Sequence, residues 1–428
     1  MIPKIKSNRI EFIDLARTIS ILLMLQGHFV VLWLDDRINK NTNSGLHIYE
    51  SIRGVTAPLF LTITGIVFTF LLFRGSLESF NQERFKKGKK RIVILLVWAY
   101  VLQINFHSIY SGIKYWKADK PIFDQLQKMI GERFFTFHIL HSISFGILFI
   151  LLIYYLFAKF KAFNKIGIGF LIGAFVFFAG HPFFNAYFNT HDQISFLPKG
   201  LSTIFGGENS VFPIFPSGAY VLSGAFIGYK LAHNEALFHT KTNALKIFLT
   251  AITLLLLGLI IPKYLNVFLG PLFGSEKFFT CTVTFFLRFS EALLVILLIA
   301  WIATKIKNIH PFALKIGQNT LSIYIIHSII LYGCMSGFGL DSLSTYINKN
   351  PELLYLKAPI YTISFAVLFL SLFVLQIAFF EKLNNLFFRT ANLLTRFKNS
   401  TEKPNLLQQV FTAIVLEVIV FICFKSIL

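Results

Sequence analysis

Charged residues are scarce in this chain. They make up 14% of its 428 residues, whereas a soluble protein carries roughly 25%. Hydrophobic residues account for 55%, and the mean hydropathy is +0.67. Apolar runs that approach the roughly 20 residues needed to cross a bilayer recur along the sequence. These features exclude a soluble globular protein and predict an all-α, polytopic membrane protein.

Cysteine is rarer still, and internal repeats are absent. Cys281, Cys334 and Cys423 show no spacing typical of a metal site or a redox pair. A secondary transporter usually has two related halves with broken helices at matching positions, and this chain has none. No polar stretch is long enough for a soluble domain. We therefore expect residues 1–428 to form a single integral membrane domain.

Apolar runs divide the chain into eleven candidate spans. The ninth and the eleventh are interrupted by polar residues, and the last two lie within residues 357–428. The spans lie near 12–34, 55–73, 91–113, 134–158, 165–186, 213–232, 245–266, 279–304, 314–336, 357–380 and 408–428.

Lysine and arginine are unevenly distributed among the connections. With a cytoplasmic N-terminus and alternating spans, the inner segments hold 24 of the 40 basic residues. The outer segments hold 14 basic and 11 acidic residues, and the sharpest inner block is RFKKGKKR at 84–91. This positive-inside bias predicts a cytoplasmic N-terminus and an outer C-terminus. The net charge of +20 thus reflects topology and contact with anionic headgroups of the lipid bilayer, and predicts no nucleic-acid partner.

The stretch DLARTISILLMLQGH, residues 14–28, places ionisable side chains inside the first span. Eleven residues at about 100° each bring Arg17 and His28 to one helix face, about 16.5 Å apart along the axis. Arg17 then lies toward the cytoplasm and His28 near the outer end, with Asp14 placed to orient the arginine. Ionisable residues within spans are functional candidates by default. The alternative is that Arg17 reaches the inner headgroups and His28 caps a helix end.

A cation on the inner side and an imidazole on the outer side suit a long anionic ligand that reaches through the membrane. Acyl-coenzyme A is such a ligand, because its phosphates need cations and its pantetheine arm is an extended chain. An imidazole near the thioester could take a proton from an acceptor hydroxyl or amine, since its ordinary pKa is about 6.5.

Five segments, IDLARTISILLMLQGH first among them, resemble segments of the transmembrane acyltransferase superfamily. In that superfamily an arginine, ten residues and a histidine form the signature of the first helix. The other four are similar, in family order, to segments of the branch that contains heparan-α-glucosaminide N-acetyltransferase and its bacterial relatives. All the matches fall within residues 9–331. The four are APLFLTITGIVF (57–68), HILHSISFGILF (138–149), VFPIFPSGAYVLSGAFIGYKL (211–231) and IGQNTLSIYIIHSIIL (316–331).

The resemblance implies transfer of an acyl group, most simply acetyl, from cytoplasmic acyl-CoA to an acceptor on the outer side. His28 matches the signature histidine and would act as general base or acyl carrier. Arg17 matches the signature arginine and would bind CoA, with Asp14 orienting it. Acyl-CoA would be a co-substrate, with no permanently bound cofactor. The acceptor would be an amine or hydroxyl of a sugar, a glycan, a lipid-linked saccharide or a small metabolite. A monomer and a homodimer both fit the sequence.

Further polar residues in the spans extend the list of candidates. Tyr324 and His327 share a helix face at a spacing of three, in the same motif as Asn319, which makes His327 the second catalytic or substrate candidate. His138 and His141 have the same spacing. Local hydrogen bonding is the alternative for each histidine. Because no carboxylate or cysteine accompanies them at ligand spacing, we expect no metal.

Three further charges fall within or beside spans. Arg288 and Glu291 are three residues apart and fit either an internal ion pair that fixes packing or an acceptor-binding site. Arg53 lies at the outer entry to the second span, where it would meet an anionic acceptor or a headgroup.

Two other function classes compete with the acyltransferase. They are a secondary transporter, which should show related halves, and a polyisoprenyl-linked glycan flippase or polymerase, which should show a large charged outer loop. The sequence favours the acyltransferase. Its bias toward Phe, Ile, Lys and Asn indicates a bacterial source and so predicts the inner membrane.

Overall fold

The computed structural model describes residues 11–35, 44–115, 120–188, 191, 194–273, 275–306, 309–334, 337 and 339–375. The described chain is 82% helix and contains no β-strand. An isolated bridge joins Phe137 and Ser210. The protein is therefore an all-α, polytopic membrane protein, as the apolar runs predict. The predicted span near 408–428 lies outside the described residues.

The described helices follow one another with short connections. Two short 3₁₀ segments, Phe163–Lys165 and Pro351–Lys357, lie among them, and a further helix covers Pro359–Leu375. The α-helices are α1 Glu11–Trp33, α2 Ser44–Gly54, α3 Thr56–Phe73, α4 Gln82–Val101, α5 Phe106–Tyr115, α6 Lys120–Phe134, α7 Ile139–Lys159, α8 Ile166–Phe188, α9 Lys199–Ser202, α10 Ile214–His233, α11 Lys241–Phe273, α12 Ser275–Lys305, α13 Pro311–Gln318, α14 Thr320–Tyr332 and α15 Leu340–Lys349.

Six described helices are long and apolar enough to cross a bilayer, and a seventh span results if the pair Pro351–Lys357 and Pro359–Leu375, bent by 62°, counts as one. The six overlap the predicted spans near 12–34, 55–73, 134–158, 165–186, 245–266 and 279–304. The total of eleven remains a prediction.

Two predicted spans differ from the helices that form there. The run near 91–113 is divided, because α4 ends at Val101 and Asn105 starts α5 by accepting a hydrogen bond from Ser108 N (2.9 Å). The run near 314–336 is also divided, because α13 ends at Gln318 and α14 begins at Thr320. Both breaks lie where polar side chains interrupt the apolar pattern.

Glycines let α3 and α10 cross with their backbones in contact. A Cβ atom on Gly224 would lie 2.1 Å from Thr62 O, and one on Gly228 would lie 2.3 Å from Ile66 O. The two glycines are four residues apart and so share one face of α10, an arrangement that permits close helix contact in membranes. This contact fixes the middle of α3, and the start of the same helix lines the candidate site.

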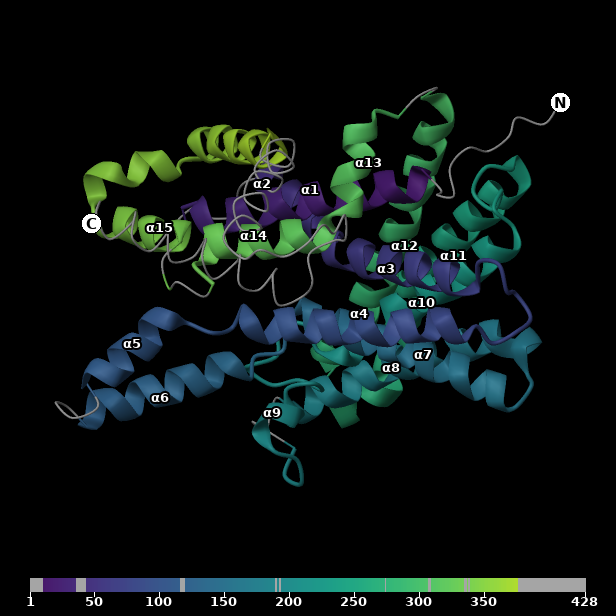
Figure 1. Ribbon diagram of the computed structural model, residues 1–428, viewed down its shortest axis with the longest axis horizontal. Helices are drawn as coiled ribbons and strands as arrows, with labels where there is room; N and C mark the ends of the chain where they lie inside the picture. Colours follow the sequence, from purple (N-terminus) through teal and green to yellow (C-terminus); the bar gives the residue numbers. More distant parts are fainter. Residues whose placement is uncertain are drawn as a thin grey trace, which may run out of the picture.

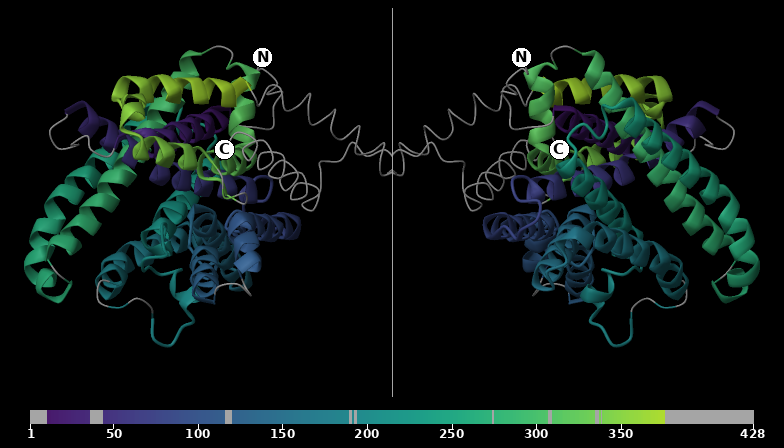
Figure 2. Two further views of the ribbon diagram at one scale, coloured as in Figure 1. Left: turned by 90° about the vertical axis from the view of Figure 1, so that its left-hand side faces the viewer. Right: turned by 90° about the vertical axis from the view of Figure 1, so that its right-hand side faces the viewer.

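Two groups of helices lie side by side (Figure 1). One contains α1, α13, α14 and α15, and the other contains α4, α7 and α8. The α11–α12 hairpin leans away from both groups (Figure 2), and α5 with α6 extends past the ends of α4 and α7. The space between the two groups, with α3 against both, holds the polar residues discussed next.

Candidate active site

His28 and His327 meet although 299 residues separate them in the sequence. His28 Nδ1 lies 3.2 Å from His327 Nε2, and their rings are tilted with centroids 5.2 Å apart. His327 is fully buried and His28 is half-buried. Tyr332 packs against the His28 ring edge to face, with centroids 5.8 Å apart. The His28 imidazole is thus held by two rings of α14.

The hydrogen-bond partners of the two histidines indicate which ring nitrogens carry protons. His327 Nδ1 lies 3.2 Å from Ile323 O, and a carbonyl oxygen only accepts, so His327 Nδ1 carries a proton. A buried imidazole costs less free energy when neutral, which leaves a lone pair on His327 Nε2. His28 Nδ1 must then donate to it. The unprotonated nitrogen of His28 is consequently Nε2.

His28 lines a cavity of about 700 Å³ between α1, α3, α4, α7 and α14. We call it the outer chamber, because the predicted topology places this end of α1 outside. Its size fits the 300–1,000 Å³ typical of ligand sites. Most of its wall is apolar, and the polar or charged residues on the wall are His28, Arg53, Thr56, Gln103, Arg133, His138, Tyr324, Ser328, Tyr332, Cys334 and Asp341.

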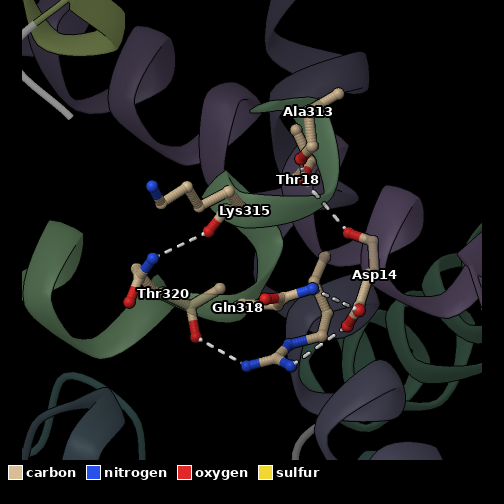
Figure 3. Close-up of polar contacts among 8 residues, drawn as sticks. Asp14, Thr18, Ala313, Lys315, Gln318 and Thr320 are labelled. Carbon is tan, nitrogen blue, oxygen red and sulfur yellow. Dashed lines mark hydrogen bonds and ion pairs between the residues drawn. The ribbon is translucent and has the colours of Figure 1, made fainter. Parts of the chain in front are cut away.

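Arg17 is held at the other end of α1 by the junction of α13 and α14. Its Nη1 lies 3.5 Å from Asp14 Oδ1, and its Nη2 donates to Thr320 Oγ1 (3.1 Å). Gln318 Nε2 donates to the second Asp14 oxygen (3.0 Å), so the aspartate is bonded on both oxygens (Figure 3). The pairing predicted between Asp14 and Arg17 is therefore present, and α13–α14 supplies partners that orient it.

Close packing brings α1 and α13 together at this point. A Cβ atom on Gly317 would lie 2.0 Å from Asp14 O, so the two backbones touch. Thr18 Oγ1 donates to Ala313 O at 2.5 Å (Figure 3). Asn319 Nδ2 donates to Lys315 O (2.9 Å) and so closes α13, but Asn319 lines neither chamber.

Arg17 lines a second cavity of about 290 Å³, which we call the inner chamber. Arg91, from the basic block 84–91, lines it as well, together with Thr64, Gln318 and Thr320. Two guanidinium groups thus lie on the wall of one small cavity on the side predicted to be cytoplasmic.

The two chambers are neighbours that share part of their walls. Phe60 of α3, Leu140 of α7 and Tyr324 of α14 line both cavities. Arg17 and His28 therefore line two adjacent cavities along α1, with an apolar and aromatic junction of these three residues between them. Tyr324 also contacts the His327 ring edge to face, with centroids 5.0 Å apart.

His138 and His141 have different surroundings despite their shared spacing. His138 lines the outer chamber. His141 is 2% exposed, accepts from His138 N through Nδ1 (3.2 Å), and stacks on Phe137. His141 therefore contributes to the start of α7 and lies off the chamber wall.

The two remaining candidate arginines, Arg53 and Arg288, also lie in different places. Arg53 lines the outer chamber, and its Nε and Nη2 both contact Glu50 Oε2, at 3.0 and 2.5 Å. Arg288 lines neither chamber. Its Nη1 donates to Glu291 Oε2 (2.9 Å) and to Ser51 O (2.7 Å), so it joins α12 to the end of α2. This geometry matches the packing interpretation of the Arg288–Glu291 pair.

Several wall residues have no distinctive sequence signal. Gln318 and Thr320 flank the Asn319 motif, and Arg91 closes a basic block that topology alone explains. Arg133 lies in a predicted connection, and Gln103 lies within the predicted span near 91–113. Among the described residues, no three His, Cys, Asp or Glu side chains lie close enough together to hold a metal ion.

A family model described as an acyltransferase domain matches residues 10–390, a range that contains all the chamber residues named above. No curated protein and no solved structure matches the chain. The polytopic all-α fold agrees with an integral membrane enzyme. The chain belongs to this family of membrane acyltransferases.

Proposed function

We propose that the protein transfers an acyl group from acyl-CoA, which enters the inner chamber, to an acceptor in the outer chamber. The observation that carries the proposal is the wall shared by the two chambers, because the cavity that Arg17 lines is then adjacent to the cavity that His28 lines. Family membership favours this reaction over the secondary transporter and the glycan flippase or polymerase.

The inner chamber suits the donor. At about 290 Å³ it is narrow, so it would hold the extended pantetheine arm while the nucleotide stays at the basic mouth formed by residues 84–91. Arg17 and Arg91 would bind phosphate oxygens, since guanidinium groups form paired, charge-assisted hydrogen bonds with phosphate. The distance from Arg17 to His28, about 16.5 Å along the helix, would bring the thioester near the junction at Tyr324.

The outer chamber suits the chemistry. His28 Nε2 takes the proton of the acceptor hydroxyl or amine as the acceptor oxygen or nitrogen attacks the thioester carbonyl carbon. The C–S bond then breaks, and the protonated imidazole returns the proton to the departing thiolate, which leaves as CoA thiol. His327 accepts from His28 Nδ1 throughout and stabilises the charged imidazole.

A two-step route uses the same lone pair. Here His28 Nε2 attacks the thioester, CoA leaves, and the acceptor then takes the acyl group from the histidine. With enzyme and acetyl-CoA but no acceptor, a stoichiometric release of CoA supports this route, whereas the direct route releases none.

Binding of acetyl-CoA to purified protein tests the proposal, with wild type compared with Arg17→Ala and His28→Ala. We expect binding by the wild type, loss of binding in Arg17→Ala and retention in His28→Ala. Absence of binding to the wild type would overturn the proposal. Gly112→Ala, on α5 away from both chambers, serves as the control and should bind normally.

The finer points of the proposal rest on the sequence. They are acetyl as the acyl group, a sugar or glycan amine or hydroxyl on the outer side as the acceptor, kinship with the heparan-α-glucosaminide N-acetyltransferase branch, and residence in a bacterial inner membrane. The oligomeric state, monomer or homodimer, stays open to measurement by light scattering in detergent.

A further inference from the structure

The outer chamber has on its wall a guanidinium that no described carboxylate pairs with. Arg133, at the end of α6, lines the chamber, and its guanidinium makes no hydrogen bond or ion pair with any described residue. A guanidinium has five N–H donors and no acceptor, so all five are available to a ligand.

Arg53 adds a second, partly available guanidinium. Its bonds to Glu50 use Nε and Nη2, and both reach the same carboxylate oxygen, which leaves Nη1 without a partner among the described residues. The side chain crosses Gly27, where a Cβ atom would lie 3.2 Å from Arg53 Cγ, and so lies next to His28. An anionic group on Arg53 Nη1 would therefore be close to the reacting imidazole.

Arg133 begins a turn that hydrogen bonds hold in place. Gln103, at the end of α4, donates through Nε2 to Thr136 O, and Thr136 N donates to Arg133 O (3.2 Å). Phe137 N then donates to Asn209 O (2.8 Å). The turn after α6 is thus tied to α4 and to the segment before α10, which fixes the place of Arg133 on the wall.

Two buried polar atoms of the wall residues favour a ligand with hydroxyl groups. Gln103 Oε1 and Thr56 Oγ1 have no hydrogen-bond partner among the described residues, and their residues are 5% and 8% exposed. Buried polar groups without partners are rare and costly in proteins. Both atoms are fully buried, so the hydroxyl groups of a polyhydroxy ligand would pair with them once the Gln103 and Thr56 side chains turn toward the chamber.

We propose that the acceptor is an anionic saccharide, whose carboxylate or phosphate binds Arg133 and Arg53 while a hydroxyl or amine lies at His28 Nε2. This inference rests on the proposed function, because it names the chemistry of the acceptor. Asp341, an exposed carboxylate at the wall, is the acidic residue of the chamber and would repel an anion that bound near α15, directing the anion toward the arginines.

Direct binding of three probes tests the proposal on the full chain in phosphatidylcholine nanodiscs. The probes are glucuronate, glucose 6-phosphate and glucose, measured by saturation-transfer NMR without acyl-CoA. We expect at least one acidic probe to bind about tenfold or more tightly than glucose, the factor given by one charge-assisted hydrogen bond. The two acidic probes distinguish a carboxylate from a phosphate acceptor.

Variants identify the residue responsible for the preference for acidic probes. Arg133→Gln should abolish the preference for the acidic probe, and Arg133→Lys should retain part of it, because lysine keeps the charge without the planar fork. Lys349→Gln removes the same charge from an exposed site on α15 and should leave the preference intact. Equal binding of acidic and neutral probes, or a preference that survives in Arg133→Gln, would overturn the inference.

Two controls separate the possible failures. Acetyl-CoA binding is measured on the same samples: if it persists without a preference for acidic probes, the acceptor inference alone fails, and if it is absent while the preference holds, the proposed function alone fails. Retained acetyl-CoA binding also shows that Arg133→Gln is folded. Nanodiscs that contain phosphatidylglycerol test a headgroup contact, because loss of acidic-probe binding in them would assign Arg133 to lipid and overturn the inference.

Discussion

His28 Nδ1 and His327 Nε2 lie 3.2 Å apart, and the hydrogen bonds that run from Ile323 O through both rings leave His28 Nε2 without a proton. The two histidines come from α1 and α14, which approach because Gly317 allows α13 to touch the backbone of α1. Packing at one end of α1 therefore supports the orientation of an imidazole at the other end.

Replacement of His327 tests this orientation. In His327→Leu the partner of His28 Nδ1 is lost, the ring can adopt the other tautomer, and we expect kcat to fall by about 10²-fold, the lower end of what a positioned general base contributes. His327→Gln can still accept from His28 Nδ1 through its amide oxygen and should retain a larger part of kcat. KM for acetyl-CoA should change little in either variant, because His327 lines neither chamber.

Steady-state kinetics at several pH values check the prediction. A purely structural role for His327 would lower the melting temperature and reduce the kcat of the glutamine and leucine variants equally. Equal kcat values in the two variants would therefore contradict an orienting role.

Arg17 should contribute mainly to donor binding. Arg17→Ala removes a guanidinium from the wall of the inner chamber, and we expect acetyl-CoA to bind at least about tenfold more weakly, as for loss of a charge-assisted hydrogen bond. Thr320→Val removes the 3.1 Å bond to Arg17 but keeps the charge, so the loss should be only a few-fold. Isothermal titration with acetyl-CoA measures both, and a Thr320→Val loss as large as that of Arg17→Ala would argue for a structural role of the network.

The sequence predicts part of the site because those residues lie on one helix or in one motif. Arg17 and His28 share a face of a single span, so helical periodicity alone relates them. Tyr324 and His327 are three residues apart on α14, and both lie at the site. The same spacing pairs His138 with His141, yet only His138 lines the chamber, because the first turn of α7 directs His141 toward Phe137.

The remaining features depend on tertiary packing. Thr320 accepts a hydrogen bond from Arg17 across 303 residues of sequence, and no sequence pattern near Thr320 indicates this contact. Arg91 is one of several basic residues in its block, and only the place of α4 beside α7 turns it toward the inner chamber. The breaks at Asn105 and Asn319 fall at polar residues inside two predicted spans, because polar caps there compete with helix continuation.

The junction between the chambers should control passage of the thioester. Phe60→Trp enlarges a half-buried side chain that lines both cavities. We expect kcat for acyl transfer to fall while the affinity for CoA, whose nucleotide stays in the inner mouth, changes by less than about threefold, or roughly 0.6 kcal/mol. Phe60→Leu, which is smaller, should not reduce kcat. A comparable loss of CoA affinity in Phe60→Trp would show that the substitution disturbs the inner site as well.

The crossing of α3 and α10 should be the part of the fold least tolerant of added side-chain atoms. In Gly224→Ala the new Cβ would lie 2.1 Å from Thr62 O, so the helices must separate, at a cost of about 1–3 kcal/mol. Gly112→Ala is the matched control, because a Cβ there meets nothing within 4 Å, and alanine in a helix is favoured over glycine by about 0.5–1 kcal/mol. Thermal unfolding in detergent should thus show a lower melting temperature for Gly224→Ala and an equal or higher one for Gly112→Ala.

Since α3 also carries Thr56 and Phe60 on the chamber wall, the Gly224→Ala variant should lose transferase activity even below its melting temperature. Full activity in a Gly224→Ala protein of unchanged stability would mean that the two backbones do not touch.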